Sequence, residues 1–246
     1  MVITPQHLDI PKHISLGFSS RKGGMSVAPF EGLNMSSKRG DSQNNVDSNR
    51  QLFLNNFGID ESHLAQPVQI SRDGIQVVQS PGIYADKDAL ITQTVGTYLS
   101  VLTADCSPIL IWSTAHPVIG AVHSGWQGSE RDILGQTLSK MMNEFDVKPA
   151  ALSMAIGPGL CQDHFEVGPE FSKKFPMEYL KPLPGTDRFH FDNNQYLYDT
   201  AVKSGVPATQ IEVLSYCSYA DHELFYSHRR DGEQTGRMMS VIGIHV

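Results

Sequence analysis

Cysteine is scarce in this sequence, and long apolar runs are absent. The 246 residues include three cysteines, Cys106, Cys161 and Cys217, which are too few and too far apart for a disulfide framework or a CxxC zinc knuckle. No run of about 18 apolar residues occurs, and the start lacks a basic segment followed by an apolar one. We therefore expect a cytoplasmic protein without membrane insertion, in which Cys161 and Cys217 are core thiols.

Positive charge is also scarce. The formal net charge is -7 at pH 7, with 19 Lys and Arg residues against 26 Asp and Glu residues. A nucleic-acid-binding surface needs a basic stripe that neutralises many phosphates, so no nucleic-acid partner is expected. A few local arginines would suffice for a small anion. Because 40% of the residues are hydrophobic, the chain can bury a large core, and we expect one α/β domain over residues 1–246.

Several common catalytic signatures are missing. The sequence has no GxGxxG after a strand, no GxxxxGK[ST], no HExxH and no GxSxG, which removes the usual grounds for dinucleotide, P-loop, zincin and α/β-hydrolase sites. His164-Phe165-Glu166 imitates the HxE of zinc nucleobase deaminases, but no PCxxC supplies the remaining thiolates. None of the ten histidines forms an HxH pair, which disfavours a blue-copper oxidase.

Apolar patterning predicts a mixture of strands and helices. Strands are expected at residues 14–20, 74–78, 98–103, 151–156, 211–214, 224–228 and 238–244. The clearest helix runs from Ser129, its N-cap, to Phe145, and further helices are expected at residues 49–57 and from the cap Asp192 to Lys203. The polar segment of residues 21–45 reads as a long irregular loop, which is often functional.

A predicted hairpin brings two reactive side chains together. Residues 108–112 and 118–122 flank a turn near His116, so residues whose numbers sum to about 231 should face each other. His123 then lies opposite Pro108 and close to Cys106. A thiolate and an imidazole suit zinc, which in catalytic sites has three protein ligands and an open position for water. On spacing alone, however, a buried thiol and a histidine bound by a backbone carbonyl is the favoured interpretation of these two residues.

The glycine-rich turn of residues 125–128 leads directly into the predicted helix. Its free backbone N–H groups and the positive helix end would lie beside His123, an arrangement that can hold phosphate. An ordinary capped helix start, in which Glu130 and Asp132 interact with the helix dipole, is the alternative interpretation.

Ordered motifs extend over nearly the whole chain. TADCSPILIW, AVHSGWQGSERDIL, AIGPGLCQDHFEVGPEF and FYSHRRDGEQTGRM, preceded by GFSSRKGGMS and GLNMSSKRGD, resemble those of the multicopper polyphenol oxidase (laccase-domain) family, whose members are now described as purine nucleoside phosphorylases. The resemblance implies an α/β fold, a single domain with mixed β-sheets and flanking helices. It also implies a zinc-dependent enzyme that cleaves adenosine, inosine, guanosine and methylthioadenosine with phosphate and deaminates adenosine.

The resemblance also implies the roles of individual residues. Cys106 and His123 match two metal ligands of the family, and Ser71 stands where the third, a histidine, is expected. A serine hydroxyl is a poor zinc ligand, so weak zinc binding is expected. Asp105 is interpreted as an orienting or acid-base group beside the catalytic Cys106 and His123. The residues expected to bind substrate are Arg21, Asn34, Ser71 and Gln127, the last of which replaces a cation of the family.

Three functional hypotheses follow. The first is a zinc-dependent purine nucleoside phosphorylase, the second a copper-dependent, laccase-like polyphenol oxidoreductase using the same ligands, and the third a non-catalytic descendant that binds nucleosides or a partner. Phosphate-dependent release of free purine distinguishes the first, and oxygen uptake with a phenol distinguishes the second. Retained ligand binding without either product would indicate the third.

Overall fold

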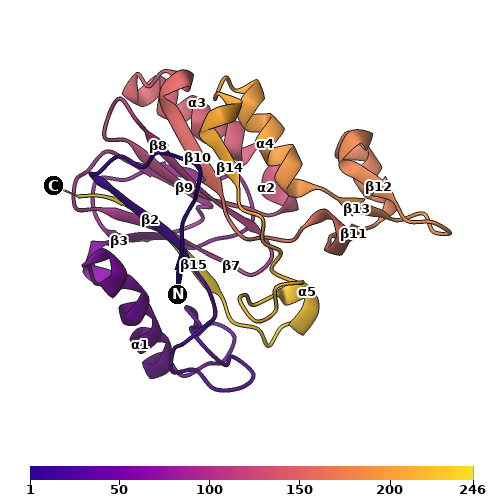
Figure 1. Ribbon diagram of the computed structural model, residues 1–246, viewed down its shortest axis with the longest axis horizontal. Coiled ribbons are helices and arrows are strands. Elements are labelled where there is room, and N and C mark those ends of the chain that lie inside the picture. The colour runs from indigo at the N-terminus through magenta and orange to yellow at the C-terminus, as the bar shows by residue number, and fades with distance from the viewer. Residues whose placement is uncertain (246) are drawn as a thin grey trace.

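Two six-stranded sheets form the centre of the protein in the computed structural model, which describes residues 1–245 (Figure 1). The first sheet has the order β1 (Val2–Ile3), β2 (Ile14–Ser19), β15 (Met238–Ile244), β7 (Tyr98–Thr103), β3 (Leu64–Pro67) and β5 (Gly82–Tyr84). The second has the order β14 (Ile211–Val213), β10 (Leu152–Ile156), β8 (Ser107–Ser113), β9 (Ile119–Ser124), β6 (Ala89–Thr92) and β4 (Ile75–Val77). Each contains parallel and antiparallel pairs, which confirms the expected mixed sheets.

A small third sheet projects to one side of the molecule (Figure 1). Its strands are β11 (Glu166–Val167), β13 (Phe189–Phe191) and β12 (Leu180–Pro182). The helices are α1 (Gln43–Leu54), α2 (Trp126–Glu130), α3 (Ile133–Phe145), α4 (Asn193–Lys203) and α5 (His228–Asp231). Short 3-10 turns connect many of these elements. Within the described residues, no helix is long and apolar enough to cross a membrane.

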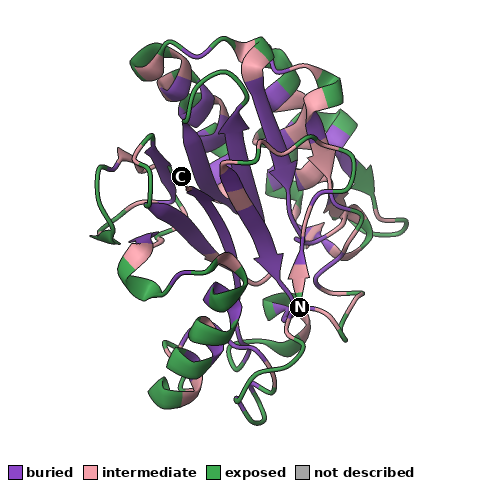
Figure 2. Cartoon of the chain, turned by 60° about the vertical axis from the view of Figure 1, so that its left-hand side comes forward, coloured by how far each residue is buried: buried purple, intermediate pink, exposed green. Residues whose placement is uncertain are grey.

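The two large sheets pack face to face, and longer helices cover their outer faces. Phe18 and Leu99 of the first sheet share one buried cluster with Leu110 and Trp112 of the second. The opposite face of the second sheet packs on α3 and α4, whereas α1 packs on the outer face of the first. Because β8 is covered on both faces, all of its residues are buried, and between its terminal serines the sequence is a continuous apolar run instead of an alternating one. Burial of the strands is general in the centre of the molecule (Figure 2).

The chain passes between the two large sheets twice at the same end. Residues 68–74 connect β3 to β4, and residues 104–106 connect β7 to β8. The Gln69 side chain links the first of these connections to the end of β7, where the second begins. Its amide donates to the Leu102 carbonyl at 2.7 Å and accepts from the Leu102 N–H at 2.8 Å. This end of the sheets carries the residues that the sequence singled out.

The predicted hairpin register is confirmed. Pro108 pairs with His123 and Trp112 pairs with Ile119, so the residue numbers of each pair sum to 231. The helix capped by Asp192 is also confirmed, since the Asp192 carboxylate accepts a hydrogen bond from the Gln195 N–H at 3.0 Å.

Three predictions are wrong in whole or in part. The helix expected at residues 49–57 begins at Gln43 and ends at Leu54, and a 3-10 turn follows it. Helix α3 begins at Ile133 and not near Ser129, because Asp132 adopts a left-handed conformation (φ 56°) and caps it, and the residues before it form the separate helix α2. The expected strand at residues 224–228 is absent from this part of the described chain, since Ser227 caps α5 by accepting from the Arg230 N–H. The Asp231-Gly232 pair ends this helix.

We predict that Asp192→Ala destabilises the protein by about 1 kcal/mol, because it removes the side-chain acceptor for the first turn of α4. Urea unfolding measures the change. Asp187→Ala removes an exposed carboxylate from a nearby loop and is the matched control, for which the unfolding free energy should stay the same. Equal destabilisation by both variants would contradict the capping role.

Candidate functional site

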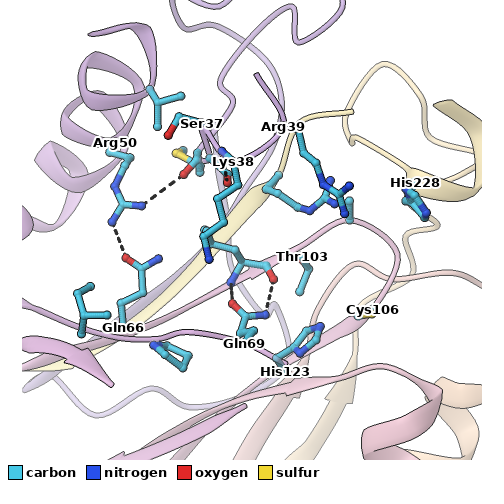
Figure 3. Close-up of a pocket in the computed structure, with 18 of the residues that line it drawn as sticks. Ser37, Lys38, Arg39, Arg50, Gln66, Gln69, Thr103, Cys106, His123 and His228 are labelled. Atoms are coloured by element: carbon cyan, nitrogen blue, oxygen red, sulfur yellow. Dashed lines mark hydrogen bonds between the residues drawn. The ribbon is translucent and has the colours of Figure 1, made fainter. Parts of the chain in front are cut away.

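A cavity of about 550 Å³ opens where the chain crosses between the sheets (Figure 3). Ser71, Cys106 and His123 all line it, as the sequence predicted for residues of one site. Opposite them lie the loop of residues 35–39 and one side of α1. His228 and Arg237, from the C-terminal part of the chain, complete the wall.

Cys106 and His123 interact at the bottom of this cavity. The His123 Nδ1 lies 2.7 Å from the Asp88 carboxylate, which leaves Nε2 for the hydrogen bond with the Cys106 sulfur. Burial alone would lower the pKa of His123, but the Cys106 sulfur and the Asp88 carboxylate outweigh it and raise the pKa to about 9. The turn behind Cys106 must begin with glycine, because a Cβ on Gly125 would lie 2.8 Å from the sulfur.

Asp88 holds both His123 and the segment of residues 70–72, which belongs to the connection between β3 and β4. Its fully buried carboxylate accepts hydrogen bonds from the backbone N–H groups of Ser71 at 2.9 Å and Arg72 at 2.8 Å, and from Ile70 at 3.3 Å. Burial would raise the pKa of Asp88, but the bond from His123 and the backbone donors hold it below its usual value. A carboxylate on the far nitrogen of a histidine is the common support of a metal-binding imidazole.

Ser71 occupies an unusual backbone conformation. Its φ of 57° lies in the left-handed region, where histidine, asparagine and aspartate are more frequent than other residues with a Cβ. The Asp88 oxygen that binds its N–H also binds Nδ1 of His123. The Asp88 carboxylate therefore holds Ser71 and His123 together at the cavity.

Cationic side chains gather on the opposite wall. Lys38, Arg39 and Arg237 line the cavity, and among the described residues no carboxylate pairs with Lys38 or Arg237. Arg39 forms an ion pair with Glu233. Burial, together with the charge of Arg39, lowers the pKa of the Arg237 guanidinium. Two neighbouring guanidinium groups in a partly buried wall favour an anionic ligand.

Asp105 and Asn34 support the cavity but do not line it. The Asp105 carboxylate accepts from the Ser218 hydroxyl at 2.7 Å and from the Arg229 N–H at 2.6 Å. The buried Asn34 accepts from the backbone N–H groups of Ser36 and Arg237, both of which belong to cavity-lining residues. These two residues therefore position the segments around the cavity.

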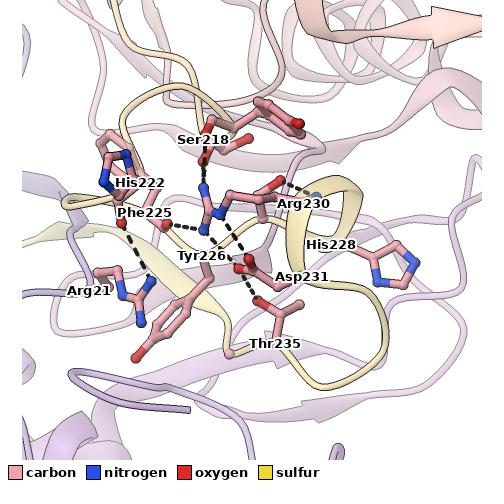
Figure 4. Close-up of polar contacts among 12 residues, drawn as sticks. Arg21, Ser218, His222, Phe225, Tyr226, His228, Arg230, Asp231 and Thr235 are labelled. Atoms are coloured by element: carbon pink, nitrogen blue, oxygen red, sulfur yellow. Dashed lines mark hydrogen bonds and ion pairs between the residues drawn. The ribbon is translucent and has the colours of Figure 1, made fainter. Parts of the chain in front are cut away.

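Arg21 and Gln127 also lie outside the cavity lining. The Arg21 guanidinium stacks over the Tyr226 ring at 4.6 Å and donates to the carbonyls of Glu31 and His222 (Figure 4). Gln127 belongs to α2, where its carbonyl accepts from Arg131. The predicted phosphate turn is thus the first turn of a five-residue helix, and the structure puts the cations on another wall.

The Arg229-Arg230-Asp231-Gly232 part of the FYSHRRDGEQTGRM motif stabilises the segment next to the cavity-lining His228. Arg230 donates to the carbonyls of Ser218, Tyr219 and Phe225 and pairs with Asp231 (Figure 4). The fold that it stabilises presents His228 to the cavity.

A second cluster was missed at the sequence level. Cys161, His164 and Cys217, interpreted above as core thiols and a misleading HxE histidine, place their ligand atoms within 4.8 Å of one another. None of them lines the cavity. A spacing of more than fifty residues between the cysteines hid this proximity.

Comparisons with known proteins agree with the motifs. Residues 15–245 match the family described as multi-copper polyphenol oxidoreductase laccase. This chain belongs to that family. A family relative in Deinococcus radiodurans, named purine nucleoside phosphorylase, is 37% identical over 92% of this chain and 88% of its own. The Escherichia coli protein named purine nucleoside phosphorylase YfiH is 32% identical over 94% of both chains.

Solved structures of other bacterial proteins share the fold. The Bacillus licheniformis hypothetical protein YfiH has a TM-score of 0.90 at 26% identity, covering 94% of this chain and 92% of its own. YlmD from Geobacillus stearothermophilus has a TM-score of 0.88 at 26% identity, covering 96% of this chain and 93% of its own.

The laccase family implies a bound metal, but the cavity residues do not complete its site. A catalytic zinc needs three protein ligands, and here Cys106 and His123 supply two beside the neutral hydroxyl of Ser71. Among the described residues, the grouping of three or more His, Cys, Asp and Glu ligands occurs at Cys161, His164 and Cys217 and not in the cavity. The cavity therefore presents a thiol–imidazole pair supported by Asp88.

Ser71→His should raise zinc affinity at Cys106 and His123 by more than about tenfold, because it adds a third ligand to the cavity wall at a position whose backbone is already held by Asp88. Competition with a chelating dye measures the affinity, and only zinc that a further Cys106→Ser change removes is counted. Ser37→His adds an imidazole to another wall and is the control. If the two histidine variants bind equally, Ser71 does not belong to the metal position.

The raised pKa of His123 gives a pH-dependent prediction. Because the folded pKa of about 9 lies above the ordinary 6.5, the contribution of charged His123 to stability is complete below about pH 6.5 and is lost as the pH rises through 9. The difference in unfolding free energy between the protein and His123→Gln should therefore shrink from pH 6.5 to pH 9.5. In chelator-treated protein, NMR titration should give a His123 titration midpoint near pH 9. Cys106→Ser should lower this midpoint, because it removes the sulfur that raises the pKa. A midpoint at or below pH 6.5 in the unmodified protein would contradict the raised pKa of His123.

Proposed function

We propose that this protein is a purine nucleoside phosphorylase. The observation that carries the proposal is the single cavity in which Lys38, Arg39 and Arg237 face Cys106 and His123. Its volume of about 550 Å³ is within the range of small-molecule sites. The names of the relatives supply the substrate class.

Phosphate is proposed to bind at the cationic wall. Lys38 is exposed at the cavity mouth, and its ammonium group has no partner among the described residues. Arg237 donates to the carbonyls of Thr235 and Gly236 through one nitrogen, which leaves other N–H groups for an anion. Arginine binds two phosphate oxygens at once, whereas lysine supplies a point charge. The two side chains together would fix the orientation of the phosphate.

The nucleoside is proposed to lie between this phosphate and the Cys106–His123 pair. A phosphate oxygen attacks C1′ of the ribose, and the bond between C1′ and the purine nitrogen breaks. The nitrogen takes the bonding electrons and needs a proton to leave as free purine. His123, which lines the cavity, is the group that we propose to deliver it, from the Nε2 nitrogen that otherwise bonds to the Cys106 sulfur. Binding both reactants in one cavity supplies the alignment that makes this displacement fast.

The finer substrate range belongs to the same proposal. Adenosine, inosine, guanosine and methylthioadenosine share the purine and the C1′ bond, so all four are candidate substrates. Deamination of adenosine would appear as inosine in the absence of phosphate. Laccase-like oxidation with copper is the competing function, and it is recognised by oxygen uptake with a phenol.

We predict phosphate-dependent release of hypoxanthine from inosine, together with ribose 1-phosphate. Lys38→Met should raise the phosphate KM by roughly tenfold with a smaller change for inosine, because the loss of one charge from an anion site costs on the order of 1.4 kcal/mol. Chromatography of the products measures both constants. Lys148→Met, which removes a charge from the opposite end of the sheets, is the control.

Three outcomes bear against the proposal. Purine release that is independent of phosphate would indicate hydrolysis. Oxygen uptake with a phenol and no purine release would favour the oxidoreductase. Nucleoside binding in calorimetry without turnover would identify a non-catalytic binder.

A further inference from the structure

A compact group of metal-ligating atoms lies outside the cavity. The Cys161 sulfur is 3.2 Å from Nδ1 of His164, and the Cys217 sulfur is 3.5 Å from the same nitrogen. Cys217 is buried, whereas Cys161 and His164 are partly exposed, so solvent reaches one side of the group. These three residues form a thiol–histidine cluster.

The backbone fixes the thiol–histidine cluster before any ligand binds. Gly159 and Cys217 form a β-bridge, and the Ser218 N–H donates to the Gly159 carbonyl at 2.8 Å. The Cys161 N–H points at the Cys217 sulfur at 3.3 Å, which holds the two cysteines side by side. A 3-10 turn that begins after Cys161 returns His164 to the pair. The His164 ring is also held, since it stacks on Tyr219 with a centroid distance of 4.5 Å.

The distances in the cluster agree with those of a zinc site. Zinc binds sulfur at about 2.3 Å and imidazole nitrogen at about 2.0 Å, so tetrahedral geometry separates the sulfur from the nitrogen by about 3.6 Å. The two sulfur–nitrogen distances, 3.2 and 3.5 Å, lie within a few tenths of an ångström of that separation. Only a small adjustment of side chains is needed to admit the ion.

We propose that Cys161, His164 and Cys217 bind one zinc ion at a site separate from the nucleoside cavity. Two thiolates and an imidazole form a soft donor set that suits zinc, and they leave a fourth position for water on the exposed side. On binding, each thiol releases its proton to solvent, and His164 coordinates through neutral Nδ1 with its own proton on Nε2.

The zinc ion would brace the loop that carries the cavity thiol. Leu160, next to Cys161, donates its N–H to the Asp105 carbonyl at 2.9 Å. Ser218, next to Cys217, donates its hydroxyl to the Asp105 carboxylate at 2.7 Å. Asp105 immediately precedes Cys106 in the chain. Metal bound at the cluster would therefore join the two segments that hold this turn, and its effect would be on stability.

The decisive experiment counts zinc in matched variants kept under reducing conditions. The native protein should hold about one equivalent that depends on the cluster. Cys161→Ser and His164→Gln should each lose most of it, whereas Cys106→Ser should retain it. Zinc addition should raise the thermal midpoint of the chelator-treated native protein and of Cys106→Ser, but not that of Cys161→Ser.

Cobalt substitution tests the ligands directly. The native protein and Cys106→Ser should show the same sulfur-to-cobalt charge-transfer bands, and Cys161→Ser should show weaker ones. This measurement decides the matter even if a cluster variant unfolds, because it can be read in the native protein and Cys106→Ser alone. A metal that disappears with Cys106→Ser, or a native protein that binds neither zinc nor cobalt through sulfur, would overturn the proposal.

Discussion

The buried carboxylate of Asp88 is the interaction on which the candidate site depends. A charge with no exposure to water is costly unless several donors surround it, and here three backbone N–H groups and one imidazole do so. The same hydrogen bonds set the left-handed backbone at Ser71 and orient the ring of His123. One side chain therefore determines the relative positions of a crossing between the sheets and of a cavity wall.

The packing of the sheets explains why the cavity forms where it does. Both large sheets are covered on both faces, so side chains in the middle of the strands are occupied with the core. At the end of the sheets where the chain leaves one sheet for the other, polar groups from several segments reach a shared space. The loop of residues 35–39 and the segment around Arg237 close that space, and the Asn34 amide joins these two segments.

Local patterns predicted part of this structure and tertiary contacts determined the rest. The hairpin register followed from the turn and the apolar runs, and it correctly placed Cys106 near His123. The split between α2 and α3 did not follow, because Asp132 has an ordinary helix-compatible sequence context and its left-handed conformation becomes apparent only in the fold. Lys38 and Arg237 lie near opposite ends of the sequence but line the same cavity. The residues of the thiol–histidine cluster are also brought together from separate parts of the sequence. The periodicity of the sequence therefore could not predict either group.

The central position of β15 in the first sheet has a consequence for synthesis. β2 and β7 each pair with this strand and not with each other, although both precede it by more than a hundred residues. Until residues 238–244 emerge from the ribosome, both strands have unpaired edges that can join other chains. A nascent chain of this topology therefore exposes two strand edges throughout that interval, and its order of synthesis leaves the central strand of the first sheet until last.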